Sequence, residues 1–98
     1  MEINVGLLCR SFQRALLFNI PRGVRLISFE QVADLVIRTL IVCEFELNET
    51  AKQHLLGAAG EVEGDFVDAM ECTVEFIVDA KTIDNVVRLK HVVFAMAE

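Results

Sequence analysis

The sequence predicts a mainly α protein, an irregular bundle of four or five helices in a single domain that spans residues 1–98. Three observations lead to this fold class. Apolar residues recur at helical spacing through most of the chain. The 98 residues suit one domain, and 54% of them are hydrophobic, which is ample for one core. The single proline, Pro21, stands in the clearest break, residues 19–23, and no linker divides the chain further.

The first predicted helix runs from about Ile3 to Phe18. Its apolar residues share one helical face, while arginine and glutamine lie on the other. That apolar face consists of Val5, Leu8, Cys9, Phe12, Ala15 and Leu16. The alternative is a strand near residues 2–9, because every second residue from Ile3 to Cys9 is apolar.

A second helix is predicted from Ser28 to Cys43, after the break. Ser28 and Gln31 match a capping box, in which a serine hydroxyl and a glutamine side chain satisfy the first free amides of a helix. The apolar residues that follow keep the helical period, and charged residues lie opposite them. Because its apolar arc is wide, we expect this helix at the centre of the bundle or in an interface.

The third predicted helix is short. Asn48 can cap it, and it ends near Gly57 or Gly60, before a flexible acidic loop at residues 60–64.

The last two segments are also predicted to be helices. Residues 65–79 favour a helix by their length and by a clean apolar stripe. A strand near residues 71–79 is the alternative, because this stretch is rich in β-branched residues that alternate with polar ones. Together with a strand at 2–9, it would give an α+β fold. Thr82 can cap the final helix, where alternation is poor.

The net charge of -6 is unevenly distributed along the chain. Residues 1–40 hold five arginines and three acids, a balance of +2, whereas residues 41–98 hold four basic and twelve acidic residues, a balance of -8. Such asymmetry indicates either pairing between two surfaces of the chain or two separate docking faces. The candidate interaction surface comprises Arg10, Arg14, Arg22, Arg25, Asp68, Glu71, Glu75 and Asp79.

Motifs for catalysis or metal binding are not found in the sequence. It has no catalytic serine elbow, phosphate loop or zinc-ligand spacing, so we expect no enzyme activity, cofactor or metal. The segment from His54 to Gly60 resembles the phosphorylated segment of histidine phosphotransfer domains, which implies a phosphocarrier role for His54. It departs from them at Gly57, where those domains carry the lysine that stabilises the phosphoryl charge. The three cysteines are widely spaced, and we expect reduced, mostly buried thiols.

The composition favours a non-enzymatic protein–protein interaction module. So short a chain has much surface for its volume, and its apolar surplus predicts self-association, as a homodimer that acts as an adaptor, inhibitor or assembly subunit. The alternative is a small regulatory protein that contacts nucleic acid through the four arginines, which the acidity and the absence of tryptophan and tyrosine disfavour. Apolar runs too short to span a membrane, and a start without a basic region, predict a cytoplasmic protein.

Leu40 lies in the most apolar part of the predicted second helix, so a charge at this position should disrupt the packing of the core or of an interface more than elsewhere. We expect Leu40→Asp to unfold the protein or to abolish its assembly, because a buried carboxylate loses its hydration. Thermal melting and light scattering check this. A variant with unchanged melting temperature and mass would refute the expectation.

Overall fold

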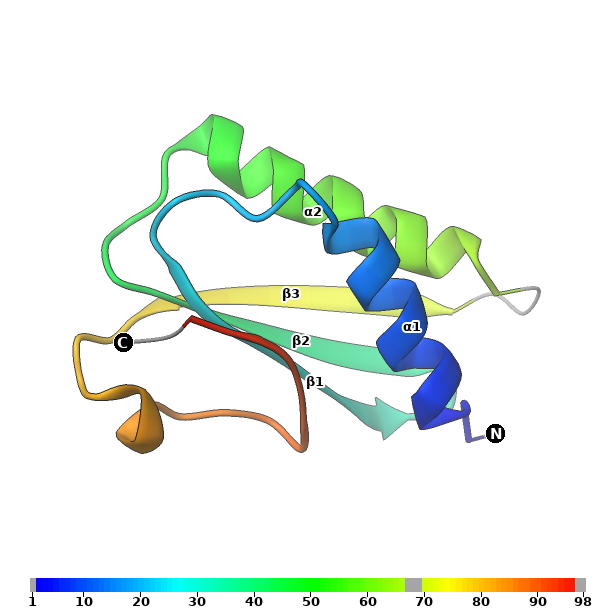
Figure 1. The fold of residues 1–98 in the computed structure, drawn as a ribbon. Helices are drawn as coiled ribbons and strands as arrows, with labels where there is room; N and C mark the ends of the chain where they lie inside the picture. Colours follow the sequence, from blue (N-terminus) through cyan, green and yellow to red (C-terminus); the bar gives the residue numbers. More distant parts are fainter. Residues whose placement is uncertain (1, 67–69, 97–98) are drawn as a thin grey trace.

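The computed structural model has an α+β fold, so the predicted bundle of four or five helices is wrong (Figure 1). It describes residues 2–66 and 70–96. Among these residues, two α-helices lie on one side of one sheet with the strand order β3-β2-β1-β4. The elements in chain order are α1 (Val5–Leu16), β1 (Val24–Ala33), β2 (Val36–Cys43), α2 (Glu49–Gly64), β3 (Glu71–Val78), a 3-10 helix (Ile83–Asn85) and β4 (His91–Ala95).

The sheet is mixed because its connections differ in length. β1 and β2 are antiparallel and are joined by the two-residue turn of Asp34 and Leu35, in which Leu35 adopts a φ of 57°. β3 is parallel to β2, since α2 crosses over the sheet between them. β4 returns antiparallel to β1 and pairs with its residues 26–29. β3 and β4 are therefore the two edge strands.

The hairpin of β1 and β2 is buried on both faces except near its turn, where Val32 and Ala33 are exposed. On the helix side, Phe29, Ile37 and Ile41 pack in the main core beneath α1 and α2. On the opposite side, Leu26, Leu40 and Val42 form a smaller core with Val86. Figure 1 shows the segment between β3 and β4 crossing that opposite side. The two central strands are thus covered on both faces, like the strands of a sheet that lies between two other layers.

Residues 28–43, predicted as a helix, form most of the hairpin. Ser28 does not cap a helix, because its hydroxyl is fully buried and accepts a hydrogen bond from the Leu89 amide at 2.9 Å. Leu40 is 2% exposed and belongs to β2, so the Leu40→Asp prediction now concerns a buried strand residue instead of a helical one. A strand covered on both faces has apolar residues at consecutive positions. In this segment some of those residues also recur at helical spacing, so the pattern predicted a helix.

The predicted helix at residues 65–79 is also wrong, and the alternative strand near 71–79 is confirmed as β3. Its side chains alternate between half-buried and exposed, as expected for an edge strand. The predicted final helix is instead the 3-10 turn and β4. The segment needs extended backbone to cross the sheet and return along β1, so tertiary packing overrides its local helical pattern.

Two helices were predicted correctly, with different ends. Asn4 caps α1 by accepting a hydrogen bond from the Leu7 amide at 3.1 Å, so a strand at residues 2–9 is wrong. Asn48 caps α2 through the Ala51 amide at 2.8 Å. α2 continues through the predicted acidic loop at 60–64, where Val62 is fully buried in the main core and so favours the helix over a loop.

Thr39 on β2 provides a test of the core. Its residue is 3% exposed, and its hydroxyl oxygen has no hydrogen-bond partner among the residues that the structure describes. Burying an unpaired hydroxyl costs about 1–3 kcal/mol. We expect Thr39→Val to raise the free energy of unfolding by about 1 kcal/mol, measured by urea denaturation. Thr39→Ser keeps the hydroxyl but loses a methyl group, and should lower it; a valine variant less stable than the wild type would contradict this account.

Candidate functional site

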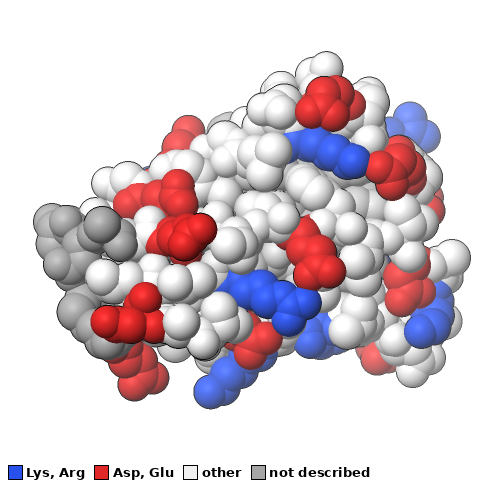
Figure 2. All heavy atoms as spheres, turned by 180° about the vertical axis from the view of Figure 1, so that it is seen from behind, with Lys and Arg blue, Asp and Glu red and all other residues white. Residues whose placement is uncertain are grey.

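The most distinctive surface of the described residues is an acidic flank where α2 packs beside β3 (Figure 1). These two elements carry five glutamates and a single lysine, Lys52, a balance of -4. The view from behind shows acidic side chains spread over this side, interspersed with basic ones (Figure 2). We define the acidic flank as Glu49, Glu61, Glu63, Glu71 and Glu75.

Contacts within the chain hold parts of this flank in place. A carboxylate oxygen of Glu63 accepts a hydrogen bond from the Cys72 amide at 2.8 Å and so ties α2 to the start of β3. Glu75 forms an ion pair with Arg38 of β2 at 2.8 Å, and this hydrogen-bonded contact raises the pKa of Arg38. Glu49, Glu61 and Glu71 are exposed, so the flank presents negative charge to solvent.

The predicted acidic residues fall partly on this flank. Glu71 and Glu75 lie four residues apart on β3, so they share one face of the strand as they would share a face of a helix. Asp79 follows the strand, and its carboxylate accepts a hydrogen bond from the Lys81 amide at 2.9 Å. Asp68 lies outside the described residues. Glu61 and Glu63 were missed, because the sequence pattern assigned them to a flexible loop.

The four predicted arginines do not form one patch. Arg25 is 8% exposed and donates a hydrogen bond to the Asp79 carbonyl oxygen at 2.6 Å. Arg14 pairs with Asp65 at the end of α2, where hydrogen bonds from Ser11 and then from Arg14 lower the pKa of the Asp65 carboxyl. Arg10 and Arg22 are exposed. The charge asymmetry along the chain is therefore partly used in pairing its two halves.

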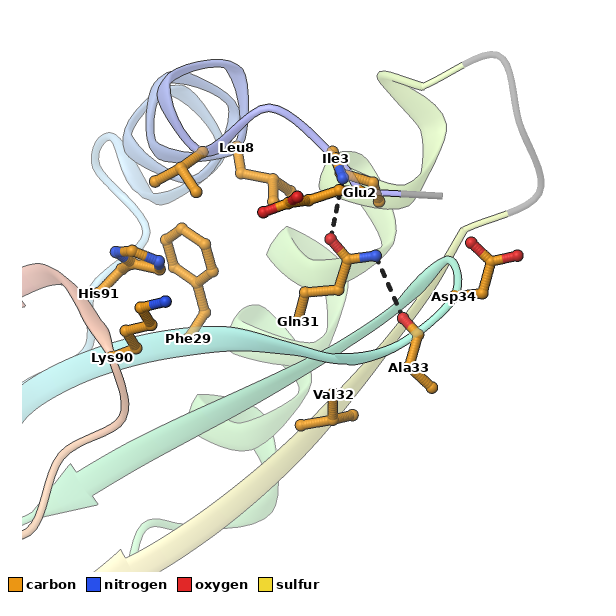
Figure 3. Close-up of a pocket in the computed structure, with 11 residues that line it drawn as sticks. Glu2, Ile3, Leu8, Phe29, Gln31, Val32, Ala33, Asp34, Lys90 and His91 are labelled. Carbon is orange, nitrogen blue, oxygen red and sulfur yellow. Dashed lines mark hydrogen bonds between the residues drawn. The ribbon is translucent and has the colours of Figure 1, made fainter.

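An open groove of about 480 Å³ lies between the start of α1 and the end of β1 (Figure 3). Phe29 and Leu8 provide apolar walls, and Lys90 and His91 line it from the side of β4. Gln31 crosses it, accepting a hydrogen bond from the Ile3 amide at 2.9 Å and donating to the Ala33 carbonyl at 3.2 Å. Gln31 thus joins the chain start to the β1–β2 turn, which is a structural task.

The turn after α1 carries an exposed aromatic side chain. Phe18 is 97% exposed and adopts a φ of 64°, a backbone conformation that bulky residues rarely occupy. Leu17 beside it is 61% exposed. This turn was not predicted, since Phe18 was expected to end the first helix; the one signal in the sequence is that Phe18 follows Leu16, the last residue of the apolar stripe. It is a second surface at which a protein could make contact.

The other candidate groups have structural surroundings. Among residues 2–66 and 70–96, no group of three or more histidine, cysteine or acidic side chains is placed to hold a metal ion. The three cysteines are free thiols, of which Cys43 is buried as predicted and Cys9 and Cys72 are half-buried. His54 is exposed on α2. None of the helices in the described part of the chain has the length and apolar character to cross a membrane.

The fold and its surfaces define a small α+β protein suited to contact another protein. The model of the MafI2 immunity protein family matches residues 6–98. The chain therefore belongs to the MafI2 immunity protein family. A comparison with curated proteins found no match. Membership in this family confirms the predicted protein–protein interaction role and favours a non-enzymatic one.

The thiols allow a test of the packing between α2 and β3. Burial, and secondarily the Glu63 carboxylate, raise the pKa of Cys72 to about 12, and burial also raises the pKa of Cys43. Because the thiolate is the reactive form, both thiols should resist iodoacetamide at pH 8 in the folded protein. Mass spectrometry of peptides from the labelled protein, which assigns each label to one cysteine, checks this, with protein in urea as the control. Labelling of Cys72 at equal rates in the two conditions would contradict the packing described.

Proposed function

We propose that this protein is an immunity protein that binds a toxin protein through the acidic flank and so neutralises it. The observation that carries the proposal is the family match over residues 6–98, joined to a flank with a balance of -4 on α2 and β3. The composition favours an adaptor, an inhibitor or an assembly subunit, and membership in an immunity protein family supports the inhibitor. The partner surface that complements this flank is basic.

Electrostatics explains why such a flank suits an inhibitor. A surface with an excess of charge of one sign attracts a partner of the opposite sign before contact and raises the association rate. Packing of α2 beside β3 and the hydrogen bond between Glu63 and Cys72 give the charges a defined pattern, which helps discriminate among partners. Attraction of this kind weakens with added salt, since the screening length falls to about 8 Å at physiological ionic strength.

The placement of the arginines weighs against nucleic acid as the partner. Two of the four are engaged within the chain, Arg14 with Asp65 and Arg25 with the Asp79 carbonyl. The acidic flank would repel phosphates. Self-association stays a prediction, and two copies that met through this flank would place like charges together.

Protection from a toxin tests the proposed function directly. Toxins that are accompanied by MafI2 immunity proteins form a panel, and each toxin is produced in bacteria with and without this chain. This chain should restore growth only for the toxin that it recognises. The purified pair should form a complex whose mass, measured by light scattering, also reports any self-association. A chain that neither binds nor protects against any toxin of such a panel would contradict the proposal.

Charge reversal tests the surface. Glu61→Lys with Glu71→Lys should lower the affinity for the toxin roughly tenfold, about 1.4 kcal/mol, with the larger change at low salt. Both side chains are exposed, so folding should be unaffected. The matched control, Glu2→Lys with Asp84→Lys, changes the net charge equally at exposed positions away from the flank. Equal loss in both variants would show that overall charge, and not this flank, governs binding.

A further inference from the structure

β3 has a free edge on the side away from β2. It is the first strand in the order β3-β2-β1-β4, and no strand of the described residues pairs with its other side. Free edges present unpaired amides and carbonyls to solvent, and natural proteins usually cover or shorten them. β3 is eight residues long, which is ample for another strand to pair with it.

Backbone hydrogen bonds at the two ends of β3 show which of its backbone groups face outward. The Glu71 amide donates to the Leu35 carbonyl at 2.9 Å, and the Asp79 amide donates to the Cys43 carbonyl at 3.0 Å. In a parallel pair, alternate residues turn their backbone groups to the same neighbour. Odd-numbered residues of β3 therefore face β2, and even-numbered residues face the free edge. The Cys72 amide agrees, because it points outward to Glu63.

Glu63 occupies only the beginning of this edge. Beyond it, the outward amides and carbonyls belong to Val74, Phe76 and Val78, which have no hydrogen-bond partner within residues 2–66 and 70–96. The edge is thus closed at Cys72 by a carboxylate and open for the remaining length of the strand. An extended segment laid along it would gain main-chain hydrogen bonds.

The charges around the edge indicate what would occupy it. Glu71 and Glu75 project on the face away from the helices, where Glu75 pairs with Arg38 of β2 and Glu71 is exposed. Glu61 and Glu63 lie on α2, on the helix side of the sheet. Lys52 is the one basic residue of these two elements, and its ammonium lies over the Phe76 ring, 5.6 Å from the centroid, while pairing with Glu46. Side chains on an added strand would meet glutamates beside them, and opposite charges on neighbouring strands stabilise pairing.

We propose that the toxin partner adds an extended, basic segment to the free edge of β3, pairing with the backbone of Val74, Phe76 and Val78. This inference rests on the proposed function and names the part of the partner that the acidic flank receives. A second copy of the chain is the less suitable occupant, because two β3 edges would bring together two flanks that each carry a balance of -4.

A peptide probe tests the edge without the toxin. We expect a short synthetic peptide that alternates lysine and valine to bind, and a peptide that alternates glutamate and valine not to bind. At saturation, the Val74 and Phe76 amide protons should exchange roughly tenfold more slowly, measured by NMR, because a hydrogen-bonded amide exchanges only on opening. A lysine peptide that leaves these amides unchanged, or equal binding of both peptides, would overturn the proposal.

Val74→Pro tests the hydrogen bonds themselves. It removes an amide that faces the free edge and takes no part in pairing with β2, so the fold should tolerate it. Binding of the lysine peptide should be lost. Val5→Pro, at the first position of α1 where proline is favoured, is the matched control and should bind as the wild type does. If Val74→Pro does not fold, a lysine peptide N-methylated at alternate residues replaces it, and it should not bind.

The toxin separates this inference from the proposed function. A Val74→Pro chain that folds, and still binds and protects as well as the wild type, would overturn edge pairing and leave the proposed function standing. A wild-type chain that protects against no toxin would remove the proposed function, whatever the peptide does. A complex of two chains joined at β3, seen as a doubled mass with slowed Val74 exchange in the absence of peptide, would favour a second copy and overturn the basic segment.

Discussion

Burial of the β1–β2 hairpin on both faces is the constraint on which the rest of the structure depends. α1 and α2 cover one face, around Phe29 and Ile41, and the segment that contains Val86 covers the other, around Leu40. With both faces occupied, further strands can join only at the sides, so β3 pairs with β2 and β4 with β1. α2 is the crossover that brings β3 beside β2. The position of the acidic flank, which consists of residues of α2 and β3, follows from that connection.

The same constraint explains why the sequence suggested a helical bundle. A strand covered on both faces carries apolar residues at consecutive positions, such as Leu40 and Ile41, and lacks the alternation that identifies an exposed sheet. The turn at Asp34 and Leu35 has no glycine, although Leu35 adopts the conformation that glycine favours. Ser28 and Gln31 imitated a helix cap, whereas the serine hydroxyl binds an amide sixty-one residues later in the chain.

Local signals were reliable where local physics decides the structure. Asn48 was predicted as a helix cap, because the bond from its side chain to a nearby amide depends on a few residues only. Asn4, predicted to lie within the first helix, makes the same kind of bond and caps that helix. Alternation at residues 71–79 indicated a strand only as the alternative to the predicted helix, and the structure has an edge strand there, with one face exposed. Glu71 and Glu75 were predicted as part of an interaction surface. The glutamates of α2 complete this surface, and they could not be predicted because the contact between α2 and β3 is tertiary. Arg25 shows the converse, since burial removes it from the predicted patch.

The central proposal is that this member of the MafI2 immunity protein family binds its toxin at the acidic flank of α2 and β3. Hydrogen exchange of the chain, alone and bound to the toxin, followed by mass spectrometry, tests that claim most directly. It predicts that protection on binding is strongest in residues 61–66 and 71–78. Protection confined to the groove beside Phe29, or to the turn at Phe18, with the flank unchanged, would contradict it.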